Sequence, residues 1–290
     1  MLNALTIDVE DYYHVSGFES VVRFQDWERY ESRVERNTNR LLDLLDEYHT
    51  KATFFVLGWI AARCPLLVRT IYARGHEVAS HGYAHQRIYT QTPQEFRQET
   101  QQSKRILEAA IGQRIYGYRA ASYSITRESL WALDILGEAG FAYDSSIFPI
   151  RHDRYGIPGY ERFCHRITRQ SGGELIEFPL STVQLAGVNI PIAGGGYLRL
   201  FPYTLIRWGI RRINVKERQP VVVYLHPWEI DTGQPRIHAG AVSRFRQYVN
   251  LEKTEGRIAQ LLQDFRFGTV STVLRDRGLL VGVGQCHHEC

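Results

Sequence analysis

The stretch Gly75-His76-Glu77-Val78-Ala79-Ser80-His81-Gly82-Tyr83-Ala84-His85 combines a glycine turn signal, a short extended run and two histidines. The run from His76 to Ala79 predicts a strand, and the glycine before it ends a helix. His81 and His85 stand four residues apart, a spacing that on a helical turn places both imidazoles on one face. Two imidazole nitrogens can start a zinc site, but a catalytic zinc needs a third protein ligand.

The same pair of histidines also has an ordinary interpretation, because histidines at this spacing occur by chance. Ser80 and Gly82 indicate the end of a strand followed by a tight turn. Functional residues gather at such places more often than inside helices. The position of the two histidines therefore favours a metal site over a chance pair, but does not by itself establish one.

The chain as a whole excludes several classes of protein. Its 290 residues allow one large α/β domain or two small ones, and the net charge of +4 comes from scattered arginines, which argues against a nucleic-acid partner. No apolar run reaches transmembrane length, and the N-terminus lacks the basic start of a signal peptide. Four cysteines without a disulfide framework, Cys64, Cys164, Cys286 and Cys290, favour a reduced, cytoplasmic protein.

The N-terminal run from Leu2 to Val9 predicts a buried strand, since it is apolar and has no helical period. It ends in the carboxylates of Asp8, Glu10 and Asp11. Because side chains alternate along a strand, Asp8 and Glu10 point the same way and Asp11 points the other way. Like charges at this distance repel one another, so a cation or an arginine is expected between them.

Predicted strands and helices alternate along the chain, which indicates a parallel sheet with right-handed crossovers. The expected strands after the first are 51–57, 76–79, 115–118, 141–143, 175–179 and 221–225, and 267–273 is a closing strand and turn. The expected helices are 37–47, capped by Asn37 or Thr38, then 65–74, 92–110, 126–137, 203–213 and 251–265. Charged residues follow the strand ends repeatedly, and in a barrel these ends share one rim.

Seven residues lie at or just past a predicted strand end, namely Asp8, Glu10, His81, His85, Arg119, Asp144 and His226. Their order and spacing resemble the polysaccharide deacetylases, which are carbohydrate esterases of family 4 with the NodB homology domain. The resemblance covers the first half of the chain and returns at Leu225-His226-Pro227. It implies a distorted, often incomplete (β/α) barrel within the α/β class, and an enzyme.

The resemblance also implies one catalytic domain over residues 1–290. Residues 1–150 and about 215–275 form the barrel core in this interpretation, and about 151–214 form a family-specific elaboration. The segment 151–272 contains Gly194-Gly195-Gly196-Tyr197 and resembles an extension found in deacetylases linked to exopolysaccharide and exosortase gene clusters. The C-terminal residues 285–290 contain metal-binding side-chain types, but a frayed terminus is expected there.

Roles follow from the resemblance motif by motif. Thr6 to Asp11 matches the motif that supplies the base, Asp8, and then an acidic metal ligand. Ser80 to His85 matches the motif of the two metal histidines. Arg119 to Ser124 resembles the motif whose arginine steers the base. Leu225-His226 resembles the motif whose histidine is the general acid.

The substrate groove is implied by a further motif, Tyr143 to Ser146, which includes Asp144. We expect Tyr123, Asp144 and Trp228 to bind substrate. The aromatic residues of the second half favour stacking on sugars, although such residues are more often core. They are Tyr155, Tyr160, Tyr197, Trp208 and Trp228.

The first motif departs from the usual form, in which two aspartates are adjacent. Here Val9 separates Asp8 from Glu10, and Asp11 follows. A subgroup with an Asp-Val-Asp pattern places base and ligand two residues apart. This leaves Glu10 as the expected metal ligand and Asp11 as the alternative.

The expected reaction is the hydrolysis of an N-acetyl group on an amino sugar in a polysaccharide or its lipid-linked precursor. One divalent metal, with zinc expected, would bind Glu10, His81 and His85, and a metal-bound water would attack the amide. Asp8, paired with Arg119, would accept a proton, and His226 would donate one to the leaving amine. Two rivals are a hydrolase of a small amide on the same fold and a catalytically inactive glycan-binding module. A complete set of ligands, base and acid argues against the inactive module.

Overall fold

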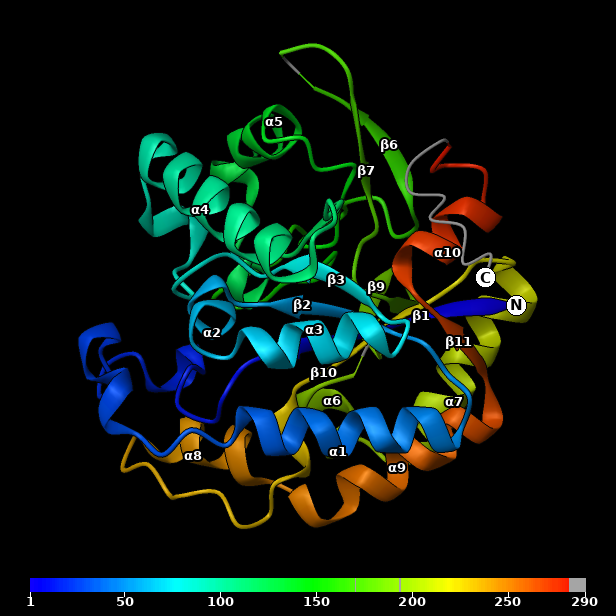
Figure 1. Ribbon diagram of the computed structural model, residues 1–290. Coiled ribbons are helices and arrows are strands. Elements are labelled where there is room, and N and C mark those ends of the chain that lie inside the picture. The colour runs from blue at the N-terminus through cyan, green and yellow to red at the C-terminus, as the bar shows by residue number, and fades with distance from the viewer. Residues whose placement is uncertain (170, 193, 282–290) are drawn as a thin grey trace.

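The computed structural model describes residues 1–169, 171–192 and 194–281, and Figure 1 shows the sheet surrounded by helices. The strands are β1 (Leu2–Val9), β2 (Thr53–Val56), β3 (Glu77–Ser80), β4 (Gly117–Tyr118), β5 (Tyr143–Asp144), β6 (His165–Thr168), β7 (Glu174–Glu177), β8 (Thr182–Leu185), β9 (Val188–Pro191), β10 (Val222–Leu225) and β11 (Arg266–Gly268). The helices are α1 (Val34–Glu47), α2 (Gly58–Arg63), α3 (Pro65–Ala73), α4 (Pro93–Ile111), α5 (Trp131–Glu138), α6 (Gly196–Leu200), α7 (Tyr203–Arg211), α8 (Ala241–Tyr248), α9 (Leu251–Asp264) and α10 (Val270–Asp276).

The main sheet has the strand order β10-β1-β2-β3-β4-β5-β7-β6, and β11 pairs with the start of β1. All of its pairings are parallel except that of β6 with β7. Within the described residues no ladder joins β10 to β6, so the sheet does not close. The predicted α/β fold, a distorted and incomplete barrel, is confirmed.

The first strand, β1, lies between β10 and β2 in the sheet, and seven of its eight residues are buried. Its register with β2 and β10 aligns the strand ends, since Ile7 is level with Leu225 and Val9 with Val56. Because parallel strands end at the same edge, the segments after β1, β3, β4 and β10 meet there. This edge is the rim that the sequence predicted for the charged residues.

Several boundaries differ from the predicted ones. The first helix begins at Val34 rather than Asn37. Neither Asn37 nor Thr38 caps it, because the capping group comes from a residue outside the helix. The expected turn after β11 is the helix α10, and the predicted strand 76–79 begins and ends one residue later, at Glu77–Ser80. The strand β7 falls within 151–214, yet it pairs in parallel with β5, so this segment contributes to the barrel sheet itself.

The carboxylate of Asp11 supplies the cap of α1. Asp11 Oδ2 accepts hydrogen bonds from the backbone N–H groups of Arg33 at 2.6 Å and Val34 at 3.0 Å, and from the Ser32 hydroxyl at 3.0 Å. The first N–H groups of a helix have no partner within the helix, and a carboxylate satisfies them well. The side chain of Asp11 therefore faces α1.

The glycines of 194–196 allow two backbones to meet. The N–H of Gly195 donates to the carbonyl of Tyr224 in β10 at 2.8 Å. At Gly194, which has a φ of +115°, a Cβ would lie 2.1 Å from that same carbonyl oxygen. Only glycine fits this close approach, and it anchors α6 beside the end of β10.

Two sequence expectations concern features outside the sheet. None of the helices among the described residues combines the length and apolarity needed to cross a lipid bilayer. Cys64 and Cys164 are free thiols. Residues 285–290, with their cysteines and histidines, lie outside the described residues.

We predict that Asp11→Ala lowers the free energy of unfolding by about 1–3 kcal/mol, because it removes a buried cap and leaves its donors unsatisfied. Urea denaturation followed by circular dichroism measures this loss. The control is Asp43→Ala, which removes an exposed carboxylate of α1 paired with Arg74. Equal stability of the two variants would contradict the capping role.

Candidate active site

A buried ion pair forms the base of the rim. Arg119, which follows β4, donates from Nη1 to Asp8 Oδ1 at 2.7 Å, and both side chains are almost completely buried. The same guanidinium donates to Thr6 Oγ1 at 2.7 Å and to the Ser145 carbonyl at 3.0 Å. The Tyr123 hydroxyl donates to the other carboxylate oxygen, Asp8 Oδ2, at 3.2 Å.

Arg119 keeps its positive charge although its side chain is buried. Desolvation alone would lower the pKa of its guanidinium, but the charge of Asp8 more than offsets that effect and raises it. Arg119 therefore holds Asp8 in one orientation, with Oδ1 engaged and Oδ2 turned toward the cavity side of the rim.

Three potential metal ligands meet beside this ion pair. Glu10 Oε1 lies 3.0 Å from His81 Nε2 and 3.0 Å from His85 Nε2, and all three side chains are buried. Burial alone would raise the pKa of Glu10, but the charges of His85 and His226 and the hydrogen bonds from both ligand histidines hold it well below its usual value. The carboxylate is therefore available as an anionic ligand.

The surroundings of His81 fit a metal ligand. Its Nδ1 lies 2.9 Å from the carbonyl oxygen of Arg119, which can only accept a hydrogen bond, so Nδ1 carries a hydrogen. Loss of the Nε2 proton on metal binding would leave a lone pair on Nε2. That lone pair faces Glu10 and His85. One carboxylate oxygen and two imidazole nitrogens are the donor set of many catalytic zinc sites.

The two histidines do not lie on a helical turn, contrary to the sequence interpretation. Residues 81–87 form a loop, in which Gly82 has a φ of +73° and His85 a φ of +51°. The half-buried carboxylate of Glu99 on α4 holds this loop, accepting from the N–H groups of Tyr83 at 3.0 Å and Ala84 at 2.8 Å. The loop still brings the imidazole centroids within 5.3 Å of each other.

The alternative ligand, Asp11, lies elsewhere. Its carboxylate is engaged by the start of α1, and the cluster of potential ligand atoms contains Glu10 instead. The alternation of side chains along β1 accounts for this division. The carboxylates of Asp8 and Glu10 face the rim, while that of Asp11 faces the helix.

His226 reaches the same place from the end of β10. Its Nε2 lies 3.9 Å from Asp8 Oδ2 and 3.8 Å from Glu10 Oε1, and its Nδ1 lies 2.5 Å from Glu229 Oε1. Burial alone would lower the pKa of His226, but Glu10, Glu229 and Asp8 raise it to about 9. The neighbouring carboxylates thus favour the protonated form of the imidazole.

The carboxylate of Glu229 is held in turn by Arg199 of α6, whose Nε donates to Oε2 at 2.7 Å. Both side chains are buried. Sequence reasoning missed Glu229 and Arg199. A signal for Glu229 was present, since the run His226-Pro227-Trp228-Glu229 has the spacing of a helix cap, and the structure shows that capping box.

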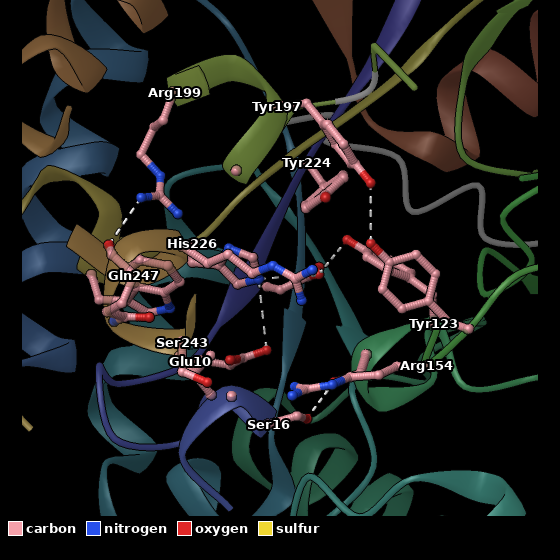
Figure 2. Close-up of a pocket in the computed structure, with 18 of the residues that line it drawn as sticks. Glu10, Ser16, Tyr123, Arg154, Tyr197, Arg199, Tyr224, His226, Ser243 and Gln247 are labelled. Atoms are coloured by element: carbon pink, nitrogen blue, oxygen red, sulfur yellow. Dashed lines mark hydrogen bonds and ion pairs between the residues drawn. The ribbon is translucent and has the colours of Figure 1, made fainter. Parts of the chain in front are cut away.

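These groups open into a cavity of about 400 Å³. Figure 2 shows His226 and Glu10 facing one another at its centre, with Tyr123 and Tyr197 on one side and Arg199 and Gln247 on the other. Of the expected substrate-binding residues, Tyr123 and Trp228 line the cavity. Of the aromatic residues singled out in the sequence, Tyr155 and Tyr197 also line it, whereas Tyr160 and Trp208 do not.

Asp144, the third expected substrate-binding residue, lies away from the cavity, so this expectation is wrong. Its side chain is fully buried and accepts a hydrogen bond from Ser146, and Asp144 is level with Glu177 of β7 in the sheet register. Burial raises the pKa of Asp144 to about 6, and burial together with Asp144 raises that of Glu177. The two carboxyls form a structural pair between β5 and β7.

The comparisons with known proteins support a polysaccharide deacetylase domain in this chain. Residues 22–141 match the family model described as polysaccharide deacetylase. Residues 145–275 match a model described as a domain of unknown function, DUF3473. The second match covers the whole of the segment 151–272 that resembled a family-specific extension.

Relatives of known activity match over part of their length. A chitooligosaccharide deacetylase from Bradyrhizobium sp. (strain ANU 289) is 33% identical over 131 residues, which are 45% of this chain and 58% of that protein. A peptidoglycan-N-acetylglucosamine deacetylase from Bacillus cereus is 33% identical over 75 residues, which are 26% of this chain and 27% of that protein. The match thus spans less than two thirds of either relative.

Solved structures share the fold over nearly the whole chain. A Mycobacterium smegmatis protein assigned to the polysaccharide deacetylases has a TM-score of 0.59 at 21% identity, covering 96% of this chain and 92% of that one. Puue allantoinase has a TM-score of 0.59 at 14% identity, covering 94% and 88%. At such identities the likeness concerns the fold alone.

We predict that Glu10→Gln and His81→Ala lower the affinity for zinc by more than tenfold, since even changes to groups that only orient a ligand cost about 10–100-fold. Asp11→Asn keeps one metal per chain, because its carboxylate faces α1. Elemental analysis after dialysis against zinc gives the stoichiometry, and a competition titration gives the affinity. Loss of the metal in Asp11→Asn with full retention in Glu10→Gln would reverse the assignment.

Proposed function

We propose that the protein is a metal-dependent N-deacetylase of an amino sugar in a polysaccharide or its precursor. The observation that carries the proposal is the position of His226 Nε2, 3.9 Å from Asp8 Oδ2 and 3.8 Å from Glu10 Oε1. A candidate acid, a candidate base and a candidate metal-ligand set thus converge at one end of a single cavity.

A divalent metal held by Glu10, His81 and His85, for which we propose zinc, would polarise the acyl oxygen and make water more acidic. The acetyl group of the substrate would lie in the cavity beside both Asp8 and His226. Asp8 Oδ2 accepts the proton of the attacking water, while Arg119 and Tyr123 hold the carboxylate in place. His226 Nε2 donates a proton to the nitrogen of the leaving amine.

The rest of the cavity suits a sugar. Tyr123, Tyr155, Tyr197 and Trp228 present aromatic faces or edges along its walls, and such surfaces pack against the apolar faces of sugar rings. The deacetylases among the relatives support the same substrate class. We propose an exopolysaccharide as the glycan, which rests on the resemblance of residues 151–272 alone.

The experiment that tests this function is metal analysis together with acetate release from a panel of N-acetylated oligosaccharides and small cyclic or linear amides. Release from the saccharides, dependent on the metal, is the expected result. Release from the small amides alone would favour the rival hydrolase. Tight binding of saccharides without release from any member of the panel would favour the glycan-binding module.

We predict that Asp8→Asn keeps the metal but lowers kcat by about 10²–10⁴-fold, which is the usual contribution of a general base. The amide of asparagine can still accept from Arg119 but cannot take a proton from water. Steady-state acetate release from metal-loaded protein measures the effect. Normal turnover in this variant would remove Asp8 from the mechanism.

We predict that His226→Ala keeps the metal while kcat falls steeply and the alkaline limb of the pH profile disappears. Burial opposes protonation of His226, but the neighbouring carboxylates raise its pKa to about 9, so activity of the wild type falls as the pH rises through the pKa of this histidine. A metal bound to Glu10 would offset the effect of the Glu10 charge on the pKa of His226. The charge of Glu229 would still raise that pKa.

The control for His226→Ala is an activated acetate ester, whose leaving group needs no proton from the enzyme. The variant should hydrolyse this ester at close to the wild-type rate. If the ester and the amide suffer equally, His226 is not the general acid.

A further inference from the structure

The cavity wall beyond the catalytic residues carries two arginines from distant segments. Arg154 lies in the loop after β5, and Arg246 lies in the last turn of α8. Both line the same cavity as Glu10 and His226. Figure 2 shows Arg154 extending from below Tyr123 toward Ser16.

The negative charges of the cavity are already engaged. Asp8 pairs with Arg119, and Glu10 contacts the two ligand histidines. A third arginine of the lining, Arg199, pairs with Glu229. Among the described residues, no carboxylate lies within salt-bridge distance of Arg154 or Arg246, so these two charges are surplus.

The two surplus charges act on one neighbour, His152, which also lines the cavity. Burial lowers the pKa of His152, and the positive charges of Arg246 and Arg154 lower it further. The facing acid is Asp153, which lies 3.0 Å from His152 Nδ1 and exposes 62% of its side chain to solvent. Arg154, Arg246 and His152 thus line one cavity, and an anion bound beside the two arginines would be stabilised by their charges.

Aromatic side chains lie next to these cations. The imidazole of His152 stacks on Tyr155 at 3.8 Å between ring centroids. The Tyr155 hydroxyl lies 3.4 Å from that of Tyr197. A sugar ring packed against these rings would bring its acidic substituent close to the arginines. The surplus charge therefore suits an anion that is part of the saccharide.

We propose that Arg154 and Arg246 form an anion subsite that binds a negatively charged group of the N-acetylated saccharide. This inference rests on the proposed function for the identity of the ligand as a saccharide. Guanidinium groups bind both phosphate and carboxylate through paired N–H donors. The anion is thus a phosphate ester at the reducing end or the carboxylate of a uronic acid.

Calorimetric titration of the full-length protein tests the subsite with three probes of similar size. They are N,N′,N″-triacetylchitotriose, called chitotriose below, its 1-phosphate and a hyaluronan tetrasaccharide. The first carries no charge, the second carries a phosphate and the third carries uronic acid carboxylates. At low salt, one of the charged probes should bind at least about tenfold more tightly than chitotriose, since hydrogen bonds to charged groups are stronger than those between neutral groups. The probe that does so identifies the anion. The preference should shrink as NaCl screens the charges.

Arg154→Ala and Arg246→Ala should each remove most of that preference. The matched controls are Arg151→Ala, in the same loop as Arg154, and Arg244→Ala, on the same helix as Arg246. Both control arginines are exposed and lie outside the cavity lining. Equal binding of the three probes, or an equal loss of preference in the controls, would overturn the subsite.

Binding and turnover separate this inference from the proposed function. Arginine-dependent binding of a charged probe, without acetate release from any probe, would overturn the deacetylase and support the anion subsite. Acetate release from chitotriose, with equal binding of all three probes, would support the deacetylase and overturn the subsite.

Discussion

The buried ion pair of Arg119 and Asp8 is the interaction on which the rim depends. The guanidinium of Arg119 contacts Asp8 and Thr6 on β1 and the Ser145 carbonyl after β5, while its backbone carbonyl orients His81 after β3. One residue thus ties together the ends of three strands. Removing either partner of such a pair would leave a charge buried without compensation, which is far more costly than losing an exposed pair.

The sequence predicted the parts of the structure that depend on local pattern. The run Leu2–Val9 forms β1 with the predicted bounds, because a strand buried on both faces is mostly apolar and has no helical period. Alternation along that strand was enough to separate Glu10 from Asp11. The rim itself was predictable because parallel strands end on one side of a sheet, so charged residues after several strands had to meet.

The features that were not predicted depend on contacts between segments far apart in the sequence. No local periodicity of a single sequence indicates such contacts. Asp144 was expected at the groove, but its partner Glu177 comes from β7, whose place beside β5 no local pattern indicates. The cap of α1 was likewise assigned to residues inside the helix, although Asp11 provides it from the end of β1. The histidine loop lost its expected helical turn because Glu99 on α4 holds its N–H groups.

The central claim is that one metal binds between Glu10, His81 and His85, and a crystal of the zinc-loaded protein tests it most directly. Anomalous difference maps recorded on both sides of the zinc absorption edge locate the ion. The account predicts one strong peak within about 2.2 Å of Glu10 Oε1, His81 Nε2 and His85 Nε2. A peak bound to Asp11 with Glu10 turned away, or no peak at the rim while zinc occupies another site, would contradict it.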